Sequence, residues 1–164
     1  MKLFLTLLLM AAAANAGLPM ICHPIEIGTA KSLPWTATNE WEGADRSYDR
    51  SRLTADTLAL LTPGAALAVR METMRRAAIY ARENARLGEE ILARLMGRVM
   101  DAEAAGKAEA TAWFDAGYFA ETQRQMARTQ QKDISGMRRG KSWVQQAIRM
   151  GGKGMDAGLA RMAD

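Results

Sequence analysis

The sequence predicts an all-α protein: a small Ala- and Met-rich bundle of three to five helices with an extended N-terminal arm and a loose basic C-terminal tail. Two observations support this prediction. Between about residues 51 and 131, apolar residues recur every three or four positions, which is the spacing of one helix face. Three of the four prolines precede residue 35, so we expect regular helices only after that point.

Residues 1–16 have the three parts of a signal peptide. Lys2 gives the start a positive charge, Leu3 to Ala14 form an apolar block, and Ala14-Asn15-Ala16 places small residues on either side of Asn15, before a cleavage site. The block is shorter than the roughly 20 residues that span a bilayer. We therefore expect cleavage after Ala16 and a periplasmic or secreted protein.

Residues 17–50 are predicted to form an extended arm. Pro19, Pro24 and Pro34 exclude a helix there. The arm also contains Trp35 and Trp41, which an arm free in solution would have no physical need for. We therefore expect the arm to lie on the helical bundle, which the sequence places at residues 51–131.

The first predicted helix of the bundle begins near Ser51. Leu53, Thr57, Leu58 and Leu61 share one helical face in this segment, and the run ends before residue 63. The next two residues, Thr62-Pro63, are typical of a helix N-terminus, with threonine as the cap and proline in the first turn. A second helix is therefore expected to start there.

A heptad repeat then continues for five repeats and predicts a helix-packing seam. Four of its ten positions are Ala or Gly, so its partner helix must approach closely. Gly88 keeps the phase of the repeat, but we expect the helix to break there, because Arg82 and Arg86 suit a helix C-terminus and Glu89 and Glu90 an N-terminus. One long helix is the alternative. The seam consists of Leu67, Met71, Met74, Ala78, Ala81, Ala85, Gly88, Leu92, Leu95 and Val99.

The last predicted element of the bundle is a helix from about residue 108 to 131, which follows a break at Gly106. Residues 132–164 form a Gly-rich basic tail with one short helix, Trp143 to Met150, capped by Ser142. This tail predicts weak contact with an anionic membrane or polymer, and nucleic acid is not expected outside the cytoplasm. The anionic-partner patch consists of Arg138, Arg139, Lys141, Arg149 and Lys153.

The single cysteine and the single histidine of the chain are neighbours, Cys22 and His23. Three interpretations remain open: two packed structural residues, an intermolecular disulfide through Cys22, or a pair of metal ligands. Met71 and Met74 share one helical face and, with a thiolate, would suit copper(I), although both occupy core positions of the seam. We expect no cofactor, with copper as the alternative.

The presence of a single histidine excludes several classes of catalytic site. Zinc sites built on several histidines and di-iron sites need more than one histidine, so the sequence excludes them. A Ser-His-Asp site would have to use His23 on the arm. No glycine-rich phosphate loop opens a predicted helix. We therefore expect no enzyme but a binding or structural protein that self-associates or binds an envelope component. The alternative is a copper or small-ligand carrier that uses Cys22, His23 and the methionine face.

Overall fold

The protein is all-α, as predicted. The computed structural model describes residues 20–36 and 43–162, so the signal peptide and Trp41 lie outside the described residues. Within these ranges an isolated bridge between Trp35 and Ala44 is the sole β-type pairing. The helices are η1 (Met20–Cys22), η2 (Arg50–Arg52), α1 (Leu53–Leu60), α2 (Leu67–Ala81), α3 (Ala85–Ala104), α4 (Ala110–Thr129), α5 (Lys141–Arg149) and α6 (Asp156–Ala160).

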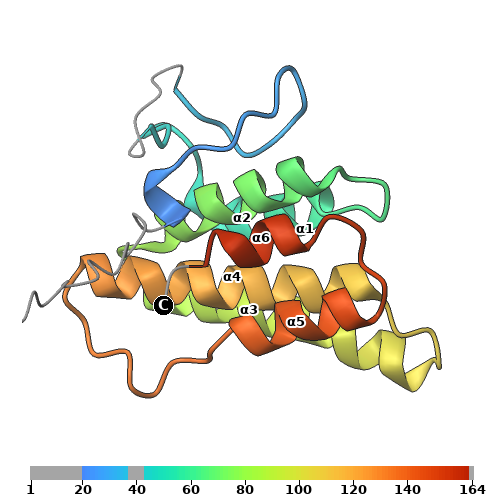
Figure 1. Cartoon of the computed structure of the whole chain (residues 1–164). Coiled ribbons are helices and arrows are strands. Elements are labelled where there is room, and N and C mark those ends of the chain that lie inside the picture. The colour runs from blue at the N-terminus through green and yellow to red at the C-terminus, as the bar shows by residue number, and fades with distance from the viewer. Residues whose placement is uncertain (1–19, 37–42, 163–164) are drawn as a thin grey trace, which may run out of the picture.

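Helix α4 is the centre of the bundle, because it packs against α2, α3 and α5. Helix α1 lies across α2 and α3, and α6 packs on α5. In Figure 1 most of the arm, in blue and cyan, lies on one side of α2, while α4 and α5 lie on the other. Across the described part of the chain, no helix is both long and apolar enough to cross a membrane.

Helix α2 is buried on all its faces: eleven of its fifteen residues are buried, four of them Arg70, Glu72, Thr73 and Arg75. A helix enclosed in this way cannot leave its charged side chains in water. Each charge must therefore find a partner inside the protein. The positions of these charges determine how the arm and the pocket described below are built.

The predicted seam is divided between two helices. The helix is interrupted at residues 82–84, a few residues before the predicted break at Gly88, and Asn84 is in an extended conformation before α3. Gly88 lies instead within α3 and is buried, where a Cβ atom would lie 2.7 Å from Oε1 of Gln123 on α4. Of the other seam positions, Leu67 and Leu92 are half-buried, Ala85 is exposed and the rest are buried.

The start of α2 was predicted too early. Thr62-Pro63 does not open the helix, which begins at Leu67. Pro63 and Gly64 form a turn instead, closed by a 3.1 Å hydrogen bond from the Ala65 N–H to the Thr62 carbonyl. This turn leaves carbonyl groups for the side chain of Arg70 to bind.

The prediction of a loose tail is wrong for residues 141–162. Val144 and Ala147 of α5 are fully buried, and Met155 and Met162 are at most 5% exposed. The start of α5 approaches α4 closely because of glycines: a Cβ atom on Gly140 would lie 1.8 Å from the carbonyl oxygen of Gly117 on α4. Small residues thus allow α5 to pack closely on α4. Helix α5 also starts at Lys141, so Ser142 does not cap it.

Candidate functional site

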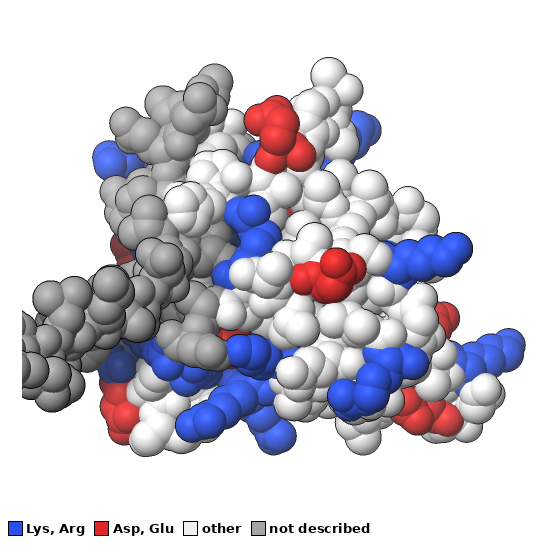
Figure 2. All heavy atoms as spheres, in the orientation of Figure 1, with Lys and Arg blue, Asp and Glu red and all other residues white. Residues whose placement is uncertain are grey.

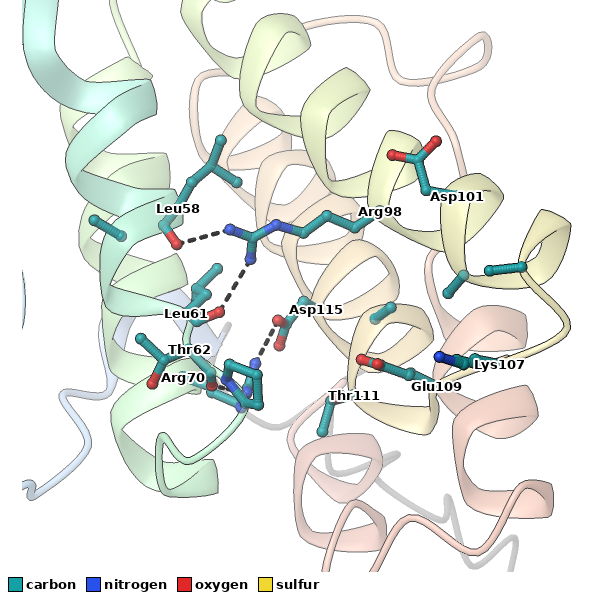
Figure 3. Close-up of a pocket in the computed structure, with 15 residues that line it drawn as sticks. Leu58, Leu61, Thr62, Arg70, Arg98, Asp101, Lys107, Glu109, Thr111 and Asp115 are labelled. Atoms are coloured by element: carbon teal, nitrogen blue, oxygen red, sulfur yellow. Dashed lines mark hydrogen bonds and ion pairs between the residues drawn. The ribbon is translucent and has the colours of Figure 1, made fainter.

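A pocket of about 620 Å³ lies between α1, α3 and α4, with the start of α2 at its inner end (Figure 3). Its walls are partly apolar, with Leu58 and Leu61 from the end of α1, Pro63 from the following turn and Ala102 from α3. Charged side chains also reach it. The charged residues that line it are Arg70, Arg98, Asp101, Lys107, Glu109 and Asp115.

The innermost charges are Arg70 of α2 and Asp115 of α4, whose side chains are 3% and 4% exposed. Nη1 of Arg70 donates to Oδ2 of Asp115. The same guanidinium donates through Nη2 to the Thr62 carbonyl and through Nε to the Ala65 carbonyl, at 3.2 Å. The turn that precedes α2 therefore holds Arg70 in a fixed position under the pocket.

The second oxygen of Asp115, Oδ1, is buried and accepts no hydrogen bond from any residue that the structure describes. Burial raises the pKa of Asp115 to about 7, against the opposing charges of Arg70 and Arg98. An unsatisfied buried acceptor costs about 1–3 kcal/mol. This environment therefore favours either protonation of the Asp115 side chain or a ligand in the pocket that donates a hydrogen bond to Oδ1.

Arg98 of α3 forms the opposite wall. Its Nη2 donates to the Leu58 carbonyl at 2.8 Å and its Nη1 to the Leu61 carbonyl at 3.0 Å, as Figure 3 shows. Arg98 thereby caps the C-terminal end of α1, where carbonyl groups lack helical partners. A guanidinium has five N–H donors, so Arg98 has more donors than these two bonds use.

A second buried charge cluster, formed by Glu72, Arg75 and Arg76, joins α2 to the arm. Glu72 Oε1 accepts from Arg75 Nη2 at 2.8 Å and Arg76 Nε at 2.7 Å, and its Oε2 accepts from Arg75 Nε at 2.8 Å. Burial raises the pKa of Glu72, but the hydrogen bonds and charges of the two arginines outweigh it, so the pKa is lowered.

The arm completes this cluster from the other side. The Ile25 N–H donates to Glu72 Oε2 at 3.0 Å, and Arg75 Nη1 donates to the Ile21 carbonyl at 3.0 Å. The guanidinium carbons of Arg75 and Arg76 also lie 4.9 and 5.2 Å from the ring centroid of Trp35. We interpret the cluster as the attachment of the arm rather than as a ligand site.

The structure does not bring together the residues of the copper alternative. Cys22 is a half-buried free thiol beside Ile21 and Met126, and burial raises its pKa, so the neutral thiol is favoured. His23 is exposed. Met71 and Met74 lie in a different apolar cluster, the main core. Among the described residues there is also no group of three or more His, Cys, Asp and Glu side chains that could hold a metal ion.

The basic residues of the anionic-partner patch lie on and around α5. Arg138, Arg139, Arg149 and Lys153 are exposed and Lys141 is half-buried. Figure 2 shows basic side chains along the lower part of this face, with acidic side chains among them. Arg149 also binds its own helix, since its Nη2 donates to Oε1 of Gln146 at 2.7 Å. The patch is therefore a mixed-charge surface rather than a continuous basic one.

None of Arg70, Arg98 and Asp115 was predicted from the sequence to be a site residue. One signal was available: Asp115 is the single charged residue from Ala110 to Ala120, in a helix that carries Phe114 and Phe119. A lone carboxylate in an apolar segment indicates a buried partner. Comparison with known proteins adds no relative, because no family model, curated protein or solved structure matches this chain.

Proposed function

We propose that this protein is an exported, non-catalytic binding protein whose ligand occupies the pocket between α1, α3 and α4. The observation that carries the proposal is Asp115, a carboxylate buried at the inner end of the pocket with one oxygen unpaired among the described residues. A pocket of about 620 Å³ also has the size of small-molecule sites, which range over roughly 300–1,000 Å³.

Binding is favoured over catalysis by the partners of Asp115. Its carboxylate is hydrogen-bonded to Arg70, and among the described residues no hydroxyl or thiol is bonded to it that it could activate as a base. Arg98 is engaged with the end of α1. These groups fix the shape of the pocket and can orient a ligand, which is the role of the few polar groups in a binding pocket.

Export is supported by the signal-peptide pattern of residues 1–16. In that compartment the ligand belongs to the cell envelope or its surroundings, and self-association stays a proposal alongside ligand binding. A copper carrier built on Cys22, His23, Met71 and Met74 finds less support, because the two methionines lie in a different cluster from Cys22.

Native mass spectrometry of the full chain, expressed with its own residues 1–16 and purified without reductant or chelator, tests the proposal. We expect loss of 16 residues and a small-molecule adduct. The variant Ala102→Phe, which fills the pocket from α3, should lose the adduct. Ala104→Phe, at an exposed position of the same helix, should keep it. An adduct that both variants retain would contradict the proposal, and an added metal mass would favour the carrier. The same spectrum reports the subunit count.

A further inference from the structure

The inner wall of the pocket specifies the kind of group that can reach it. Oδ1 of Asp115 is an acceptor without a donor among the described residues, and Arg98 has N–H donors beyond the two that bind α1. A hydroxyl or a primary amide carries the donor that the first lacks and an acceptor for a donor such as the second. A neutral group of this kind therefore suits a wall that holds both an acceptor and donors.

The charges of the wall disfavour a charged group at the same place. An ammonium group could donate to Oδ1 but would meet the two guanidiniums of Arg70 and Arg98. A carboxylate has no hydrogen to donate to Oδ1 and would meet the carboxylate of Asp115. Like charges close together in a buried site repel strongly because water screens them little. The three charged residues at the mouth, Asp101, Lys107 and Glu109, are of both signs and add no strong preference.

The rest of the wall suits an apolar body. Leu58, Leu61 and Pro63 line one side and Ala102 and Ala112 the other. Burial of apolar surface against these side chains provides binding free energy of about 25 cal/mol per Å². The pocket thus combines one polar end with an apolar remainder.

From this arrangement we propose that the pocket binds an uncharged amphipathic small molecule. Its hydroxyl or amide group donates a hydrogen bond to Oδ1 of Asp115, and its apolar body lies against Leu58, Leu61 and Pro63. This inference rests on the proposed function, since it names the ligand class of the same pocket.

A series of six-carbon probes with one chain and different head groups tests the ligand class. Hexanol, hexanamide, hexanoate and hexylammonium are titrated into the ¹⁵N-labelled full chain at neutral pH, and amide chemical shifts are followed by NMR. We expect hexanol and hexanamide to shift amides of residues that line the pocket. Hexanoate and hexylammonium should bind about tenfold more weakly or not at all.

Two variants locate the binding. Asp115→Ala removes the acceptor and should weaken hexanamide binding about tenfold, which corresponds to one hydrogen bond to a charged group. That variant also leaves Arg70 buried without its carboxylate, so a second variant keeps the pair intact. Ala102→Phe should abolish binding of every probe, whereas Ala104→Phe should leave it unchanged.

The outcomes separate this inference from the proposed function. Tighter binding of hexanoate or hexylammonium, lost in Ala102→Phe, would overturn the uncharged ligand while the pocket remained a binding site. Equal binding of all four head groups would also overturn it, because Oδ1 would then play no part. Absence of binding, or binding that Ala102→Phe does not change, would count against both proposals.

Discussion

Helix α2 carries two buried ion clusters that differ in how completely their polar atoms are paired. In the cluster with the arm, both oxygens of Glu72 accept two hydrogen bonds each, from Arg75, Arg76 and the Ile25 N–H. In the pocket, Asp115 pairs with Arg70 through one oxygen, and the other lacks a donor among the described residues. Arginines of one helix thus take part in a closed attachment to the arm and in an open ion pair with Asp115 of α4.

This difference indicates what each cluster does. Breaking a fully paired buried cluster leaves several charges without partners, so such a cluster fixes one conformation of the arm. An incompletely paired group costs stability in the free protein, and a ligand that completes it recovers that free energy.

The largest effect should come from Glu72→Gln. The substitution leaves Arg75, which is fully buried, without a counter-charge, and should lower the free energy of unfolding by about 3–5 kcal/mol. Urea unfolding followed by circular dichroism measures it. Glu83→Gln is the matched control, because Glu83 forms an exposed ion pair with Arg50 and should cause no measurable change. Similar effects of the two substitutions would contradict the structural role of the arm cluster.

The pH dependence of stability distinguishes Asp115 from Glu72. The pKa of Asp115 is raised from 3.8 to about 7, so between these values the folded protein holds a proton that the unfolded chain releases. This group should therefore make the free energy of unfolding fall as pH rises from about 4 to 7, by roughly 3–4 kcal/mol, and then level off.

Asp115→Asn removes this titration and leaves all others in place. The stability of the variant relative to the natural protein should therefore rise with pH over the same window, as measured by urea unfolding at several pH values. Stability curves that run parallel from pH 4 to 8 would show that Asp115 titrates normally and is not the perturbed group of the pocket.

A smaller effect is expected from Arg98→Met, which retains the apolar stem but leaves the Leu58 and Leu61 carbonyls without their donors. The end of α1 should loosen, with a loss of about 2 kcal/mol. Hydrogen exchange checks this: the amides of α1 should exchange faster while those of α5 keep their protection. Unchanged exchange in α1 would mean that Arg98 serves only the pocket.

The smallest effect concerns the arm. The hydroxyl of Tyr80 donates to the Pro34 carbonyl and accepts from the Asp45 N–H at 2.9 Å. Tyr80→Phe retains ring contacts with Trp35 and Tyr48, so the loss should be about 1 kcal/mol. Limited proteolysis should cut the arm faster and spare α4. Equal cleavage rates in the two proteins would show that ring packing alone holds this part of the arm.

Local patterns predicted the helical class and the last helix of the bundle well. The helix expected from about residue 108 to 131 is α4, Ala110–Thr129, since Gly106 has a positive φ of 65° and ends the preceding segment. The predicted start of α2 was wrong because Pro63 and Gly64 favour a turn as readily as they favour the first turn of a helix. The packed tail was missed because contacts between glycine backbones leave no apolar pattern in the sequence.

The candidate site was beyond the reach of local patterns for a different reason. Arg70 and Asp115 are separated by 45 positions, and each alone resembles a solvated charge on a helix surface. Their pairing follows only from the packing of α2 against α4. Cys22 and His23 drew attention as the rarest residue types, yet rarity carries no information about which groups the fold brings together.

The bond between Arg161 Nη2 and the His23 carbonyl, 3.0 Å long, joins residues 138 positions apart. The Ile21 carbonyl, in contrast, accepts a hydrogen bond from Arg75, which is 54 positions away in the sequence. The arm is therefore held at two places, by α2 in the first half of the chain and by the residue that follows α6 near its end, so the last residues of the chain serve to fasten the first.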